Sequence, residues 1–127
     1  MATTIAQLVA KARSRVDDLD ADTVAREIAD GALVVDLRED AERRATGAIP
    51  GALHVPRGLL EFKADPAAAT HTDDLDPRRR TILYCAVGGR SALAAMSLAS
   101  LGYEDVAHLG GGFQAWLEAG RPTEQVD

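Results

Sequence analysis

The fold is decided by residues 81–95, which read TILYCAVGGRSALAA. This stretch begins as a short apolar run, Thr81 to Tyr84, and ends as an Ala- and Leu-rich segment with helical spacing. Between the two parts lies Cys85, the only cysteine of the chain. The pattern predicts a strand, a loop and a helix with a nucleophile at the end of the strand, where open α/β sheets bind their ligands.

Length and composition predict a single domain. The chain has 127 residues, of which 46% are hydrophobic and 27% charged, as is ordinary for a globular protein with its own core. Its apolar runs are shorter than the roughly 18 residues of a transmembrane helix, and residues 1–5 lack the features of a signal peptide. The net charge of −6 disfavours a general nucleic-acid-binding surface.

The single cysteine cannot form an internal disulfide, which fits a reducing compartment or a thiol kept free for chemistry. One cysteine also excludes a multi-cysteine zinc site, and His54, His71 and His108 lie far apart without ligand spacing. We therefore expect a cytoplasmic protein that binds no metal, no nucleic acid and no membrane.

Hydrophobic patterning predicts short strands that alternate with helices. Helices are expected at residues 5–14 (with a capping box from Thr4 to Gln7), from Asp20 to Gly31, and at 39–45, 57–63, 90–101 and 113–119. Strands are expected at 15–19, 32–35, 52–55, 81–84 and 105–109, with a surface loop at 64–80. Because the apolar runs are continuous, they are typical of strands buried on both faces. The order predicts a mainly parallel sheet with helices on both faces.

The loop after residue 84 carries groups that suit a reactive sulfur. The thiolate is the reactive form of cysteine, and Cys85 is expected just before the positive end of a helix. Gly88 and Gly89 can adopt left-handed backbone angles, which lets successive N–H groups form an anion nest, and Arg90 adds a positive charge. The same cradle would bind a thiosulfate, phosphate or arsenate oxyanion. The alternative is a buried, inert structural cysteine.

A second strand end is expected at the same edge of the sheet. Asp36 and Arg38 follow the strand at 32–35, and the carboxyl ends of parallel strands meet at one edge. We interpret Arg38 as a brace that pairs with Asp36 or Glu42, in preference to a substrate contact. Arg57, after the strand at 52–55, is an alternative residue for the mouth of the site.

Other polar and aromatic residues are interpreted as structural. His54 and His108 fall in predicted strands and are assigned structural roles, not roles as bases, whereas His71 is expected to be exposed. The run at 78–80 is interpreted as a solvated loop end and residues 110–112 as a turn. Trp116 is expected to anchor its helix to the core.

Three segments of the chain resemble the rhodanese family of sulfurtransferases, in the family's order. The first combines VVDLREDAE at 34–42 with GAIPGA at 47–52, and the second is CAVGGRS at 85–91. The third combines LGYEDV at 101–106 with LGGGF at 109–113, Trp116, Gly120 and Pro122. Ala48 departs from the pattern, because the family commonly has histidine there.

The resemblance implies a three-layer α/β/α rhodanese-like fold with a mainly parallel central sheet of about five strands. It implies one domain over residues 1–127, with a helical extension at 1–14 and a core at 15–122. It also implies that Cys85 takes a sulfane sulfur from a small anionic donor such as thiosulfate and becomes a persulfide. The sulfur then passes to cyanide, a thiol or a protein acceptor, without a metal or organic cofactor.

The resemblance also assigns the residues around the nucleophile. The expected persulfide-binding residues are Ala86, Val87, Gly88, Gly89 and Arg90, and the expected supporting residues are Asp36, Arg38 and Ser91.

Two alternatives stay open. A non-catalytic interaction module would share the fold, although such modules often lose the cysteine. Cysteine-dependent phosphatases that share this fold place five residues between Cys and Arg, whereas four residues separate Cys85 from Arg90. The shorter ring favours sulfur transfer over phosphatase or arsenate reductase activity.

Overall fold

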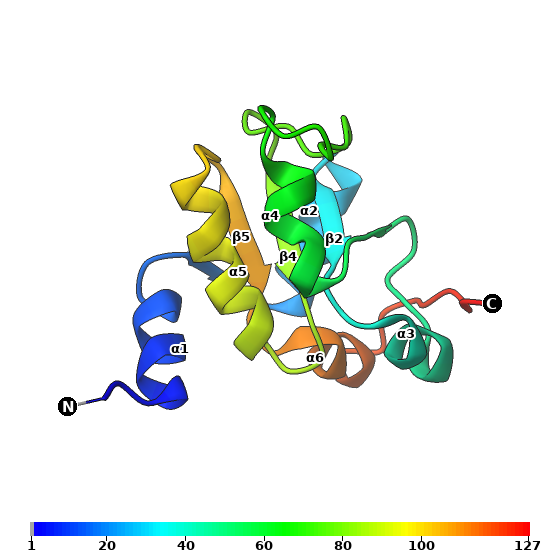
Figure 1. The fold of residues 1–127 in the computed structure, drawn as a ribbon. Helices are drawn as coiled ribbons and strands as arrows, with labels where there is room; N and C mark the ends of the chain where they lie inside the picture. The colour runs from blue at the N-terminus through cyan, green and yellow to red at the C-terminus, as the bar shows by residue number, and fades with distance from the viewer. Residues whose placement is uncertain (1) are drawn as a thin grey trace.

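The computed structural model describes residues 2–127, which form one five-stranded sheet with helices on both faces (Figure 1). The strands are β1 (Asp17–Leu19), β2 (Leu33–Asp36), β3 (Leu53–His54), β4 (Thr81–Tyr84) and β5 (Val106–Leu109). The helices are α1 (Ile5–Arg13), α2 (Ala21–Ala29), α3 (Asp40–Thr46), α4 (Leu60–Ala64), α5 (Gly89–Ser100) and α6 (Gly112–Glu118), with a 3₁₀ turn, η1 (Arg57–Leu59), before α4.

All strand pairs in the sheet are parallel, in the order β1-β5-β4-β2-β3. The prediction of a mainly parallel sheet of about five strands is therefore confirmed. Asp36 is paired in register with Tyr84, so that β2 and β4 end side by side. This register brings the residues that follow the two strands to the same edge.

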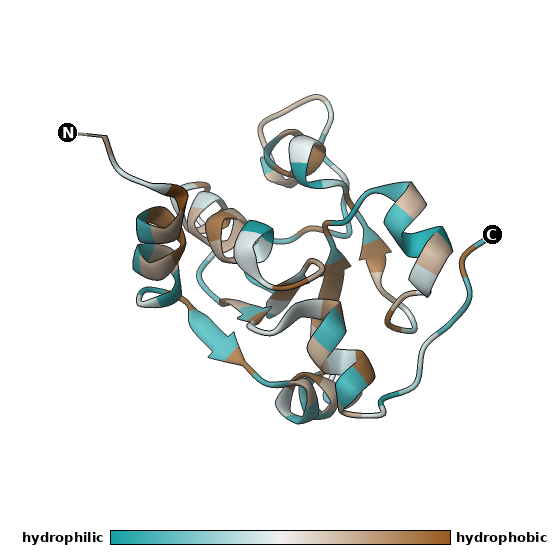
Figure 2. Cartoon of the chain, turned by 90° about the horizontal axis from the view of Figure 1, so that it is seen from below, coloured by the Kyte–Doolittle hydropathy of each residue, from teal (hydrophilic) through white to brown (hydrophobic). Residues whose placement is uncertain are grey.

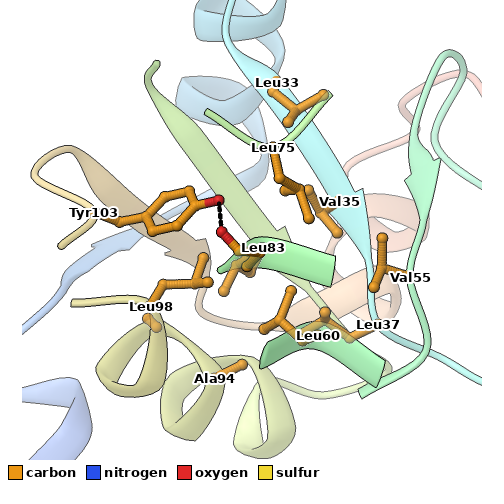
Figure 3. Close-up of a cluster of buried hydrophobic side chains, with 12 residues drawn as sticks. Leu33, Val35, Leu37, Val55, Leu60, Leu75, Leu83, Ala94, Leu98 and Tyr103 are labelled. Atoms are coloured by element: carbon orange, nitrogen blue, oxygen red, sulfur yellow. Dashed lines mark hydrogen bonds between the residues drawn. The ribbon is translucent and has the colours of Figure 1, made fainter. Parts of the chain in front are cut away.

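Two hydrophobic clusters fill the space between the sheet and its helices. On one face α4 and α5 supply Leu60 and Leu98, which pack with Leu83 of β4 (Figure 3). On the other face α2 and α6 supply Val24 and Trp116. Trp116 is 2% exposed, which confirms its predicted role as a core anchor.

The central position of β2 and β4 in the sheet follows from their apolar sequences. β2 and β4 are buried at every residue, as their uninterrupted apolar runs predict. Figure 2 shows hydrophobic residues gathered in the middle of the sheet, whereas the edge strand β1 is largely hydrophilic. The difference is typical of a strand with only one neighbour.

Helix ends also follow the predicted signals. Thr4 and Gln7 form the expected capping box at the start of α1, and Asp20 caps α2 by accepting from the Thr23 N–H. α1 packs beside α5. The predicted N-terminal extension begins at Met1, which lies outside the described residues.

The segment between α4 and β4 contains no helix or strand, as predicted, but it does not lie wholly on the surface. Leu75 in this segment is fully buried in the same cluster as Leu83. His71, expected to be exposed, exposes only 19% of its side chain and bonds the Leu75 carbonyl oxygen through Nε2 at 2.8 Å. Tyr103 closes the cluster with a hydrogen bond to the Ala64 carbonyl oxygen at 2.8 Å (Figure 3).

The charge run before β4 is likewise not simply solvated. Arg80 forms ion pairs with Glu27, Asp17 and Asp105 at 2.7, 3.0 and 2.8 Å. The prediction is wrong for Arg80 because three elements place carboxylates at the amino end of the sheet, a convergence that only the folded chain creates. None of the helices within residues 2–127 is both long and apolar enough to cross a membrane.

Candidate active site

Cys85 lies between the end of β4 and the start of α5, and it exposes 1% of its surface. Its Sγ accepts a hydrogen bond from the Gly88 backbone N–H at 3.1 Å, and its thiol faces the Ser91 hydroxyl at 3.6 Å. The sulfur therefore lies at the amino end of a 12-residue helix, close to a backbone donor.

Gly88 is required by the shape of the loop. Its φ of +107° is in the left-handed region, and a Cβ at this position would lie 2.1 Å from the Gly110 carbonyl oxygen. This conformation directs the Gly88 N–H toward Cys85 Sγ. The corresponding roles of Ala86, Val87, Gly89 and Arg90 as backbone donors remain predictions.

The segment at residues 110–112 shapes the loop from the other side. A Cβ on Gly112 would lie 2.4 Å from the Ala86 carbonyl oxygen, so the two segments are in close contact. At the start of α6, Phe113 N–H donates to the Cys85 carbonyl oxygen at 2.8 Å and Gln114 N–H to that of Ala86 at 3.1 Å. These bonds tie the Cys85 and Ala86 carbonyl oxygens to donors of α6. The sequence prediction of a simple turn missed this role.

Arg90 is engaged by Glu42 of α3. Nη1 and Nη2 donate to the two Glu42 carboxylate oxygens at 2.9 and 2.8 Å. The Glu42 hydrogen bonds, and to a smaller extent the nearby Cys85 sulfur, raise the pKa of Arg90. Arg90 in turn lowers the pKa of Glu42 to about 2. The loop cation thus has a carboxylate partner that the sequence prediction did not assign to it.

Asp36 and Arg38 form a buried brace beneath the loop. Arg38 is 2% exposed, and its Nε and Nη2 donate to the two Asp36 oxygens at 3.1 and 2.9 Å. Tyr84 donates to Asp36 at 2.7 Å, and Arg43 does so at 3.0 Å. Burial raises the pKa of Asp36, but the hydrogen bonds from Arg38 and Tyr84 outweigh it and hold the pKa below its usual value. Arg38 therefore pairs with Asp36, as the bracing interpretation proposed, and not with Glu42.

The mouth of the site has an apolar side. A groove of about 360 Å³ lies beside the loop and is lined in part by Ala86, Val87, Phe113 and Leu117. Val87 is 61% exposed at the tip of the loop. Arg57, the alternative mouth residue, instead pairs with Glu61 at 2.9 Å.

Ser91 connects the cysteine to a histidine that sequence reasoning did not associate with the site. The Ser91 hydroxyl lies 2.9 Å from Nδ1 of His108, which is fully buried on β5. No spacing in the sequence indicates this contact, because α5 and β5 meet only in the folded chain. His54, by contrast, is paired with the Arg38 carbonyl oxygen at 2.7 Å, consistent with a structural role.

Comparisons with known proteins agree on the family of this chain. The family model of the rhodanese-like domain matches residues 20–119. Protein HIGH ARSENIC CONTENT 1, mitochondrial, of Arabidopsis thaliana is 30% identical over 122 residues, which cover 87% of this chain and 70% of that protein. Thiosulfate sulfurtransferase GlpE of Pseudomonas fluorescens is 40% identical over 87 residues, which cover 68% of this chain and 71% of that protein.

A solved structure shares almost the whole fold. It is a Rhodopseudomonas palustris protein of unknown function, named as a possible tyrosine phosphatase, with a TM-score of 0.91 and 34% identity over 98% of this chain and 96% of its own. Activities named for relatives vary: a tRNA uridine(34) hydroxylase of Bartonella bacilliformis is 37% identical over 87 residues, only 28% of its length. The family match spans the Asp36 and Cys85 strand ends and most of the chain, and this protein belongs to the rhodanese-like family.

Proposed function

We propose that this protein is a sulfurtransferase that carries a sulfane sulfur on Cys85. The observation that carries the proposal is the 3.1 Å hydrogen bond from the Gly88 N–H to Cys85 Sγ at the head of α5. A backbone donor at a helix amino end stabilises an anion, and both the thiolate and the persulfide are anions.

In the first half-reaction, the Cys85 thiolate attacks the outer sulfur of a donor such as thiosulfate. A sulfur–sulfur bond forms at Cys85 while the sulfur–sulfur bond of thiosulfate breaks, and sulfite leaves with the electron pair. The product is a Cys85 persulfide whose terminal sulfur carries the negative charge. The Gly88 N–H and the neighbouring loop amides stabilise this anion.

In the second half-reaction, a thiophilic acceptor attacks the outer sulfur and Cys85 leaves as a thiolate. Cyanide becomes thiocyanate in this step, and a thiolate becomes a persulfide. The two half-reactions restore the enzyme and require only donor and acceptor. The name of the Pseudomonas fluorescens relative, a thiosulfate sulfurtransferase, supports this reaction class.

The test is the intact mass of the protein after exposure to thiosulfate. We expect an addition of one sulfur that cyanide removes, together with thiocyanate formation. Cys85→Ser should show neither, and since the chain has a single cysteine the product has one possible location. Unchanged thiocyanate formation by Cys85→Ser would contradict the proposal. If none of the sulfur donors tested forms a persulfide on Cys85, and the protein stably captures a protein partner, the chain is an interaction module instead.

A second function to test is phosphatase activity, because the Rhodopseudomonas palustris neighbour is named as a possible tyrosine phosphatase. Two observations favour sulfur transfer. Only four residues separate Cys85 from Arg90, and both terminal nitrogens of Arg90 donate to Glu42, so that a phosphate would have to share this cation with a carboxylate. We expect hydrolysis of p-nitrophenyl phosphate to stay at the level of Cys85→Ser. Hydrolysis well above that level, without persulfide formation, would replace the sulfurtransferase proposal.

A further inference from the structure

His108 is a buried titratable residue with no role in the two half-reactions of sulfur transfer. It is fully buried on β5, and its Nδ1 lies 2.9 Å from the Ser91 hydroxyl oxygen. Ser91 in turn lies 3.6 Å from Cys85 Sγ, which donates toward it. Sulfur, hydroxyl and imidazole thus form a continuous chain of polar contacts behind the nucleophile.

The other ring nitrogen of His108, Nε2, takes no part in these polar contacts. Within residues 2–127, Nε2 has no hydrogen-bond partner, although it is buried. The carboxylate oxygen Oδ1 of Asp18 on β1 lies 3.6 Å from it. An unpaired polar nitrogen in the interior is costly, so the nearby Asp18 carboxylate matters for the state of the ring.

The position of Asp18 decides which ring nitrogen carries the proton in neutral His108. A proton on Nε2 faces the Asp18 carboxylate favourably, whereas a lone pair there would face a negative charge. With the proton on Nε2, Nδ1 is an acceptor for the Ser91 hydroxyl at 2.9 Å, nearer than the Gly88 carbonyl oxygen at 3.2 Å, to which the same hydroxyl can also donate. Ser91 can then accept from the Cys85 thiol, so that the hydrogen bonds run in one direction, from Cys85 to Ser91 and from Ser91 to His108.

The charged surroundings of His108 come from two further elements. Asp18 belongs to β1, and Arg13 at the end of α1 pairs with it at 3.2 Å while donating to the Gly110 carbonyl oxygen at 3.0 Å. A surface hollow of about 520 Å³, lined in part by these three residues, lies on this side. Asp18 is 39% exposed, so the carboxylate joins the buried ring to solvent.

We propose that His108 is a positioning residue that takes up the Cys85 thiol proton through Ser91, and that Asp18 holds the resulting imidazolium. The thiol proton passes to the Ser91 oxygen while the Ser91 hydroxyl proton passes to His108 Nδ1. Ser91 ends as it began, Cys85 becomes a thiolate, and His108 becomes an imidazolium. Charge and protons balance without any other reactant.

The electrostatics of the ring act in two directions. Burial lowers the pKa of His108, Asp18 opposes the lowering, and Arg13 adds to it. The lowered pKa leaves the ring neutral at neutral pH, with Nδ1 free to accept, whereas the imidazolium depends on the Asp18 carboxylate for its stabilisation. Arg13 and Asp18 lie outside residues 20–119, so the far end of this route is supplied by a part of the chain that the family match does not include.

The first test uses alkylation of Cys85 by iodoacetamide as a function of pH, which reports thiolate formation independently of sulfur transfer. In His108→Asn, the amide oxygen can still accept from Ser91 but cannot take up a proton. We expect alkylation at pH 7 to be about tenfold slower and its midpoint to move up by about one pH unit, as a tenfold change corresponds to one unit. His71→Asn, a histidine change remote from the site, should match the wild type.

The second test separates a proton route from a merely structural contact. Ser91→Ala should produce the same shift as His108→Asn, and the double variant should add nothing further, because both changes interrupt one route. A pH profile of His108→Asn that coincides with the wild type would overturn the proposal. Absence of sulfur transfer in the wild type, with the expected alkylation shifts present in His108→Asn and Ser91→Ala, would count against the proposed function alone.

A measurement on the unaltered protein keeps the inference testable even if a variant fails to fold. Nitrogen-15 NMR of the imidazole should show that neutral His108 carries its proton on Nε2. A proton on Nδ1 would make that nitrogen a donor to Ser91, unable to accept, and would overturn the proposed route. In Asp18→Asn, which keeps the side-chain shape, the His108 titration should move to lower pH.

Discussion

Glu42 and Arg90 are bound to each other by two hydrogen bonds of 2.8 and 2.9 Å beside the Cys85 loop. The pair joins α3 to the first turn of α5, and it partly neutralises the cation nearest in sequence to the nucleophile. An anion that binds to Arg90 would therefore compete with Glu42. Glu42 of α3 thus neutralises part of the charge that Arg90 would otherwise offer to an anion.

Glu42→Gln should release this cation. We expect the KM for thiosulfate to fall about three- to tenfold, because Arg90 gains a free positive charge beside the site, and the gain should shrink as ionic strength rises. Arg90→Ala should have the opposite effect. Steady-state thiocyanate formation measures both, with Glu104→Gln as a control of equal charge change on an exposed residue. An unchanged KM in Glu42→Gln would show that Arg90 does not bind the donor.

The same pair should contribute to the acid stability of the fold. The pKa of Glu42 falls from 4.5 to about 2, mainly because of the Arg90 hydrogen bonds. A lowered folded pKa means that the pair stabilises the protein above pH 4.5 and that this contribution is lost as the pH falls toward about 2. Urea unfolding between pH 5 and pH 2 should show a smaller loss of stability in Glu42→Gln than in the wild type. Parallel pH curves would contradict this.

Two adjacent glycines offer a matched pair of substitutions. Gly88→Ala forces a left-handed residue to carry a Cβ that would lie 2.1 Å from the Gly110 carbonyl oxygen, and we expect a cost of at least about 2 kcal/mol and loss of persulfide formation. Gly89 has no positive φ, and a Cβ there would point into open space, so Gly89→Ala should stabilise the protein by about 0.5 kcal/mol. Chemical denaturation distinguishes them. Equal stabilities would contradict the loop geometry.

The buried brace predicts a large loss of stability. Arg38→Met should cost about 3–5 kcal/mol, because it removes the principal partner of the Asp36 carboxylate, which is fully buried. Arg44→Met is the control: its ion pair with Asp40 is exposed and should contribute less than about 1 kcal/mol. The free energy of unfolding from urea titrations measures both. Similar small losses would show that Arg43 and Tyr84 alone satisfy Asp36.

Leu75 tests whether the segment before β4 belongs to the core. Leu75→Ala should destabilise the fold by about 2–5 kcal/mol, since the side chain is fully buried against the sheet. Leu59→Ala, at a side chain that is 47% exposed, serves as the comparison and should cost much less. A small effect at Leu75 would mean that this segment packs loosely in solution.

The elements that could be predicted are those whose signals are local. The continuous apolar runs of β2 and β4, the capping box of α1 and the Asp20 cap of α2 each depend on a few neighbouring residues. The position of Cys85 between strand and helix follows from the same local pattern. Leu75 escaped prediction because a single buried residue in a polar segment has no periodicity.

The contacts around the sulfur could not be predicted in the same way. Glu42 meets Arg90 from 48 residues away, and His108 meets Ser91 across 17 residues, by virtue of the strand order and not of any spacing. The close approach of Gly112 to Ala86 likewise depends on how α6 docks against the loop. Local patterns locate the nucleophile, whereas its partners follow from the tertiary arrangement.

The Arg80 cluster has a consequence for handling the protein. Parallel strands give the sheet two unlike ends, and Arg80 joins Asp17, Glu27 and Asp105 at the end opposite to Cys85. Anchoring chemistry, such as a surface tether or a fluorescent label, can be directed to the exposed residues around this charged end. A protein molecule immobilised in this way would turn the Cys85 edge of its sheet toward the solution, and every molecule on a sensor surface would have the same orientation.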